Sequence, residues 1–184
     1  MALRSMRVSF NEIEMTVLKA ARGAGMEWGL AEEAAQCARW LALFDLPWQS
    51  AILSVLNAGT WHATIERDGA YLRPEPPSDW LCPIRTGAYL SDLGGDKPQS
   101  IEQVCRPILL LPFAARRSGR LLLSWKNARF CLDSGKPSIA GKSTDLDPPR
   151  VDRIAIEVQN VPHSIPLGVE CRSLYFQKNY AGMG

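Results

Sequence analysis

The sequence predicts an α+β protein in which a helical N-terminal third packs on a mainly antiparallel β portion. Two observations lead to this class. Apolar residues recur at helical spacing through residues 1–58, whereas the segments after residue 59 are short, rich in β-forming side chains, and separated by glycine or proline. The 184 residues fit a single domain over 1–184, with a helical subregion over 1–58 and a β-rich subregion with short helices over 59–184.

The first expected helix follows Ser9, because Ser9 and Glu12 have the spacing of a capping box. It ends at Gly23-Ala24-Gly25, since glycine tolerates the left-handed conformation of a C-terminal cap. Between these points, four apolar residues at helical spacing form the predicted buried stripe: Phe10, Ile13, Val17 and Ala21.

Two further helices are expected in this subregion. One starts near Leu30, with glutamates 32–33 in its first turn. The other is introduced by Asp45-Leu46-Pro47, with Asp45 as the cap and the proline in the first turn, and ends at Gly59. Their predicted inward faces are Ala34, Cys37, Ala38 and Leu41 in the first, and Trp48, Ile52, Val55 and Leu56 in the second.

After Gly59 the pattern changes to that of strands. A hairpin is expected over 60–73 around the turn Asp68-Gly69, followed by a proline loop over 74–77. We interpret residues 79–105 as two short helices, at 84–92 and 100–105. The predicted strands are 108–113, 120–126, 128–132, 153–159 and 170–176. The proline- and glycine-containing run 134–150 is predicted to be a mobile loop.

Composition and charge exclude several classes of protein. The formal net charge is only +2 and 46% of the residues are hydrophobic, which indicates neither disorder nor a global field for nucleic acid or membrane. No apolar run approaches the ~18 residues that span a bilayer. The first residues also lack the apolar stretch of a signal peptide. We therefore expect a cytoplasmic protein with no membrane partner.

The cysteines and histidines indicate neither a metal site nor a cofactor. The five cysteines, at positions 37, 82, 105, 131 and 171, are odd in number and include no Cys-x-x-Cys pair, so we expect reduced thiols. A structural zinc site normally uses paired ligands at short spacing. His62, in a strand-like stretch, and His163, in a proline-flanked loop, are instead far apart.

Two glycine patterns do not meet the requirements of phosphate-binding motifs. The glycines over 23–29 follow an expected helix, whereas a dinucleotide fingerprint follows a strand and opens a helix. Five residues separate Gly135 from Gly141-Lys142-Ser143, whereas the phosphate-binding loop has four at this place. The residues that follow also cannot begin the required helix. We expect a helix-joining turn at the first and a surface loop at the second.

A basic stretch lies between Glu102 and Asp133, where the sequence has no acidic residue but six basic ones, Arg106, Arg116, Arg117, Arg120, Lys126 and Arg129. If the arginines at 116, 117 and 120 cluster at a turn, their guanidinium groups can hold an anionic ligand or a phosphate backbone. The alternative is a solvated sheet edge. A helix-turn-helix over 9–58 would have a recognition helix without Arg or Lys, which argues against nucleic-acid binding.

The segment 82–92 is the candidate ligand site. It combines the thiol of Cys82, the guanidinium of Arg85, the phenol of Tyr89 and the carboxylate of Asp92, and Gly87 lets the backbone approach another group closely. In a helix, Arg85, Tyr89 and Asp92 share one face, which suits carboxylate binding by Arg85 and proton transfer by Asp92. The alternative is an internal salt bridge of Arg85 beside a buried Cys82.

Three N-terminal strings, 8–14, 19–34 and 39–41, resemble a bacterial family known as domain of unknown function 3726, and the strings 82–92 and 108–113 also suit it. The family name implies no activity. The order of Ser9-x-x-Glu12, Ala24-Gly25, 31–33 and 45–47 is similar to the N-terminal helices of the malate/L-lactate dehydrogenase family that lacks a Rossmann fold. That family's catalytic Ser-His-Gly is not present here, where Gln49-Ser50-Ala51 stands in the region, so this resemblance implies only a shared helical scaffold.

These observations favour an accessory subunit or oligomeric interaction module without its own catalysis, acting as a homo-oligomer or with a protein partner. The scarcity of catalytic groups, six tryptophans and a small-residue second helix support this hypothesis. The alternative is an enzyme or binder of an anionic small molecule, centred on residues 82–92.

Overall fold

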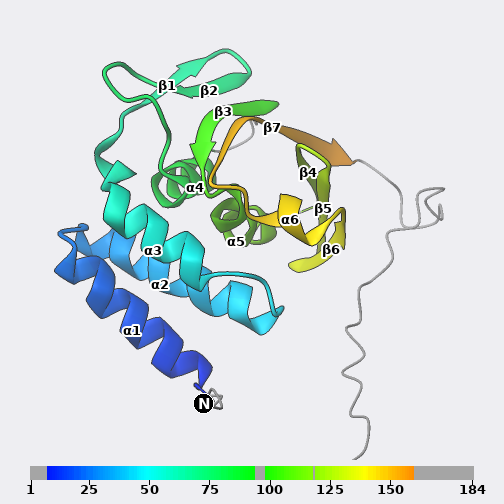
Figure 1. Ribbon diagram of the computed structural model, residues 1–184. Coiled ribbons are helices and arrows are strands. Elements are labelled where there is room, and N and C mark those ends of the chain that lie inside the picture. The colour runs from blue at the N-terminus through cyan, green and yellow to red at the C-terminus, as the bar shows by residue number, and fades with distance from the viewer. Residues whose placement is uncertain (1–7, 94–97, 118, 160–184) are drawn as a thin grey trace, which may run out of the picture.

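The computed structural model describes residues 8–93, 98–117 and 119–159. The predicted strand 170–176, together with His163 and Cys171, lies outside the described residues. Within them, the class is confirmed as α+β, with three N-terminal helices followed by a mixed, mostly antiparallel sheet (Figure 1).

Helix α1 (Phe10–Gly23) begins with the predicted capping box. The Ser9 hydroxyl accepts a hydrogen bond from the Glu12 amide at 3.2 Å, and the Glu12 carboxylate accepts one from the Ser9 amide at 2.7 Å. The predicted stripe is confirmed at three positions, Ile13, Val17 and Ala21, which are buried. Phe10 is 43% exposed, so its inclusion was wrong; it is the first residue of α1, at the outer end of the helix (Figure 1).

Replacing Ser9 by alanine should lower the free energy of unfolding by about 1 kcal/mol at neutral pH, because an orphan N–H at the helix start loses its acceptor. Hydrogen bonds from Ser9 hold the pKa of Glu12 below its ordinary value. The reciprocal bond is therefore present at neutral pH and lost as the pH falls through that lowered pKa. Urea denaturation checks the effect, and Ser9→Asn, which keeps a capping acceptor, should remain close to the parent protein.

Helices α2 (Trp28–Leu43) and α3 (Gln49–Ala58) are also present, with corrections at both starts. Helix α2 begins two residues before Leu30, so glutamates 32–33 lie beyond its first turn. Asp45 does not cap α3, which has no side-chain cap. Asp45 instead adopts a φ of 54° in the turn after α2, a conformation that a short polar side chain tolerates. Gly59 ends α3, as predicted, and adopts the left-handed conformation.

The expected hairpin is confirmed as β1 (Ile65–Asp68) and β2 (Tyr71–Pro74), joined through Gly69 with a φ of 56°. It is shorter than predicted, because residues 60–62 form the 3-10 helix η1 (Thr60–His62). The strand-like environment expected for His62 was therefore wrong.

The seven strands form one sheet in the order β1-β2-β3-β7-β4-β5-β6. The five strands after the hairpin are β3 (Ser100–Cys105), β4 (Arg120–Trp125), β5 (Ala128–Asp133), β6 (Lys136–Ala140) and β7 (Arg150–Gln159). Among the strands of the described residues, only β2 and β3 pair in parallel. Strand β7 pairs with both β3 and β4, although it follows them by many residues in the chain.

Three further predictions about the second subregion were wrong. Residues 100–105 form β3 instead of a helix, because pairing with β2 and β7 satisfies their backbone. The predicted strand 108–113 is the 3-10 helix η2 (Pro107–Leu110) continued by α5 (Leu111–Ala115), each with a proline in its first turn. The loop expected over 134–150 contains β6 and the short helix α6 (Ser143–Leu146).

Helices α4 (Pro83–Asp92) and α5 lie between the N-terminal helices and the sheet (Figure 1). The apolar core is continuous from α1 through this middle layer to the sheet. Its largest fully buried side chains include Trp125, Phe113 and Phe130. No helix in the described part of the chain has both the length and the apolar character required to cross a bilayer.

Candidate functional site

Helix α4 fixes the side chains of the predicted site. Pro83 occupies its first turn, where a missing N–H costs no hydrogen bond. The face carrying Ile84, Gly87 and Leu90 is buried against the core. The opposite face carries Arg85, Tyr89 and Asp92, and the structure places these three residues along one groove, as their spacing predicted.

The groove beside α4, which we call the α4 groove, has a volume of about 390 Å³. Helix α4 forms one wall, and the start of α2 and the segment entering β1 form the other. Residues from three parts of the sequence therefore line the groove. Arg85 and Tyr89 are half-buried in it, whereas Asp92 lies exposed at its rim. Its full lining is Glu27, Leu30, Thr64, Ile65, Arg85, Ala88, Tyr89 and Asp92.

Arg85 is held in the α4 groove by the backbone. Its Nη1 donates a hydrogen bond to the carbonyl oxygen of Trp61 at 3.0 Å. Among the described residues, the guanidinium has no carboxylate partner, which differs from the internal salt bridge considered as the alternative. The contact leaves most of the guanidinium donors available to another group.

Cys82 does not belong to the α4 groove. Its side chain is 1% exposed, and burial raises the pKa of the thiol to about 11. Hydrogen bonds from the backbone of α4 and the nearby Thr60 hydroxyl oppose this rise without cancelling it. A thiol that remains protonated at neutral pH is a poor nucleophile and a poor metal ligand. The structure therefore separates Cys82 from the three residues with which the sequence grouped it.

Gly87 does bring the backbone close to another group, and that group is the ring of Phe113. A Cβ atom at Gly87 would lie 2.1 Å from the nearest ring atom. Phe113 belongs to α5 and is 1% exposed. The glycine thus permits close packing of α4 on α5.

The three arginines proposed as an anion site have partners within the protein. Arg116 donates to the Glu33 carboxylate at 2.6 Å and to the Gln36 side chain at 2.8 Å. Arg117 donates to the carbonyl oxygens of Leu90 and Leu93, at the C-terminal end of α4. Arg120 donates to the Cys131 sulfur at 3.1 Å. The basic stretch in the sequence therefore meets acceptors from other parts of the chain.

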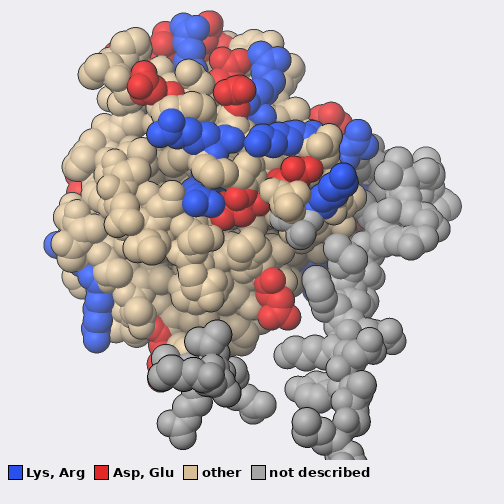
Figure 2. Space-filling view, in the orientation of Figure 1, with Lys and Arg blue, Asp and Glu red and all other residues tan. Residues whose placement is uncertain are grey.

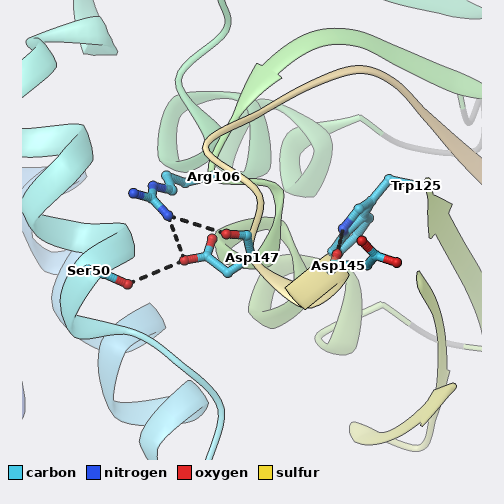
Figure 3. A network of polar contacts seen from close by, with 5 residues as sticks. All are labelled: Ser50, Arg106, Trp125, Asp145 and Asp147. Atoms are coloured by element: carbon cyan, nitrogen blue, oxygen red, sulfur yellow. Dashed lines mark hydrogen bonds and ion pairs between the residues drawn. The ribbon is translucent and has the colours of Figure 1, made fainter. Parts of the chain in front are cut away.

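A buried ion pair was missed by sequence reasoning (Figure 3). Nη1 of Arg106 donates to the Asp147 carboxylate at 3.0 Å and to its backbone carbonyl at 3.3 Å. The Asp147 side chain is 8% exposed and that of Arg106 is 18% exposed. The Ser50 hydroxyl donates to the same carboxylate at 3.4 Å. This network connects α3, the turn after β3 and the end of α6.

Neighbouring contacts hold α6 against the sheet. The Trp125 indole donates to the Asp145 backbone carbonyl at 3.0 Å, as Figure 3 also shows, and the Asn127 amide donates to the Asp145 carboxylate at 3.2 Å. The sequence offered no local signal for the ion-pair network, because Ser50, Arg106 and Asp147 come from three distant segments. The network and the Asp145 contacts together fix the course of residues 143–149.

Residues 8–73 match the model of a family described as a protein of unknown function, DUF3726. The matched segment contains α1, α2, α3 and most of the β1–β2 hairpin, so the resemblance is confirmed over these residues. The strings 82–92 and 108–113 lie outside the match. No curated protein and no solved structure matches the chain, and the resemblance to the dehydrogenase family is not shown.

Proposed function

We propose that this chain is a non-catalytic interaction module that forms a homo-oligomer through its N-terminal helices. The matched family is described without an activity. The single observation that carries the proposal is the uncharged surface of α3. Residues 46–65 contain no Asp, Glu, Lys or Arg, and Leu53 in the middle of α3 is 60% exposed.

The apolar exposure is concentrated in the helical layer. Among the described residues, six of the eight most exposed large hydrophobic side chains lie between Val8 and Leu53. Figure 2 shows a broad area over α3 with few charged side chains, whereas Lys, Arg, Asp and Glu gather over the sheet. Exposed apolar area of this kind is typical of protein–protein contact sites.

A second copy of the chain is the partner that fits this surface. In a two-fold dimer the same patch meets itself, so a charge near the two-fold axis would lie close to the same charge of the other copy. The α3 surface avoids that repulsion because it carries no charged residue. The four described cysteines are free, buried thiols, which suits the reducing cytoplasm in which we place the module.

Light scattering during size-exclusion chromatography should show a dimer or higher oligomer that Leu53→Glu converts to the monomer. The substitution places a carboxylate in each copy at the centre of the uncharged contact, where it would be desolvated. The matched control is Val158→Glu, at a 40% exposed position of β7 outside the helical layer, which should leave the oligomer intact. A monomeric parent protein, or an oligomer unchanged by Leu53→Glu, would contradict the proposal.

A further inference from the structure

The charged side chains of the α4 groove have no ion-pair partner in the part of the chain that the structure describes. In a second groove, between α2 and the Pro112 region, both arginines have carboxylate partners, Arg39 with Glu14 at 2.7 Å and Arg116 with Glu33 at 2.6 Å. In the α4 groove, neither Arg85 nor Asp92 has an ion-pair partner among the described residues. This groove therefore presents one cation and nearby carboxylates to solvent.

Arg85 is prepared to bind a carboxylate. The hydrogen bond to the Trp61 carbonyl restricts the side chain, so less conformational entropy is lost when a ligand binds. The remaining guanidinium donors match the two oxygens of a carboxylate. The Tyr89 hydroxyl and the Thr64 hydroxyl, both in the groove, also lack side-chain hydrogen bonds among the described residues and add donors of the same kind.

The rest of the groove favours an apolar body and a cationic end. Leu30, Ile65 and Ala88 contribute apolar surface between the polar groups. Asp92 and Glu27 contribute two exposed carboxylates, so a purely anionic ligand would meet net repulsion. Arg85 and Asp92 are separated by seven residues of α4, which corresponds to about 10 Å along the helix axis.

We propose that the α4 groove binds a small zwitterion whose carboxylate pairs with Arg85 and whose ammonium group lies near Asp92 and Glu27. The helical separation of the charges requires a ligand whose opposite ends are farther apart than those of an α-amino acid. An apolar chain joins the two ends and contacts Leu30, Ile65 and Ala88. No residue of α3 lines the α4 groove, so this inference does not depend on the proposed α3 contact.

The test is an NMR titration of the full chain with three probes, 6-aminohexanoate, hexanoate and hexylammonium. 6-Aminohexanoate should shift the backbone amide signals of Thr64, Ala88 and Tyr89 and bind several-fold more tightly than either singly charged probe. Arg85→Gln should weaken its binding at least tenfold, because a charged hydrogen bond is lost. Asp92→Asn should weaken 6-aminohexanoate binding but not hexanoate binding.

The matched control is Arg153→Gln, at an exposed arginine of β7 that is not part of the groove. It should bind 6-aminohexanoate like the parent protein, and the dispersion of the amide spectrum verifies the fold of each variant. Equal binding of hexanoate and 6-aminohexanoate would overturn the zwitterion assignment. Absence of shifts in the groove, or unchanged binding by Arg85→Gln, would overturn the site.

Discussion

Replacing Asp147 by alanine should lower the free energy of unfolding by about 3 kcal/mol, because the largely buried guanidinium of Arg106 would keep its charge and lose its carboxylate. The Ser50 hydroxyl would lose an acceptor at the same time. Urea denaturation at neutral pH measures the loss. The double variant Arg106→Met/Asp147→Leu removes both charges and should be close to the parent protein in stability.

The pH dependence of the stability distinguishes the penalty for ionising the buried Asp147 from the benefit of its contact with Arg106. Burial raises the pKa of Asp147 against the attraction of Arg106, so ionisation of this carboxyl is penalised in the folded state. A raised pKa gives a stabilising contribution at low pH that is lost as the pH rises through it. Asp147→Asn does not titrate and still offers Arg106 an acceptor. Its stability deficit should therefore be smaller than that of the alanine variant and should shrink from acidic to neutral pH; a deficit that grows would contradict this account.

The second large effect is expected at Gly87. Gly87→Ala should lower the free energy of unfolding by about 2 kcal/mol or more, because the new methyl group would overlap the buried ring of Phe113. This cost exceeds the gain of up to ~1 kcal/mol that alanine brings to a helix interior. Thermal and urea unfolding measure the difference.

Gly29→Ala is the matched control. Gly29 is also helical, but a Cβ atom there meets nothing within 4 Å. This change should be neutral or slightly stabilising. A second variant, Gly87→Ala/Phe113→Leu, should recover part of the loss, because the smaller side chain makes room for the methyl group. Equal stability of the two alanine variants would contradict the packing argument.

The helical part of the fold was predictable because its signals are local. The Ser9–Glu12 pair marks the start of α1, and Gly59 marks the end of α3, each through contacts within a few residues. The β1–β2 hairpin was predictable for the same reason, since Gly69 supplies the positive φ that the turn requires. The turn itself is one residue later than predicted, because Asp68 still pairs with Tyr71 and the turn residues are Gly69-Ala70.

The later segments were not predictable in the same way because their structure depends on distant partners. Residues 108–113 are apolar on all sides, and periodicity does not distinguish a buried helix from a buried strand. Residues 100–105 become a strand through pairing with β7, which comes much later in the chain. Strand β6 differs, because it pairs with the preceding strand β5 through the two-residue turn Ser134-Gly135. Both turn residues have a positive φ, 50° and 78°, which is a local hairpin signal that the sequence interpretation missed.

The candidate site shows the same division. The spacing of Arg85, Tyr89 and Asp92 placed them on one helical face, and the structure brings them to one groove. Glu27 and Thr64 complete that groove from other segments, and no local pattern linked them to α4. Cys82 was grouped with the site only because it is close in sequence.

The place of β7 in the sheet also has a consequence for biosynthesis. Strands β3 and β4 leave the ribosome earlier, yet each pairs with β7 and not with the other. Until Arg150–Gln159 has been translated, the nascent chain carries two incomplete half-sheets with unpaired edges, which are templates for aggregation. Closure of the sheet therefore has to wait for β7, whereas the N-terminal helices can form before β7 has been translated.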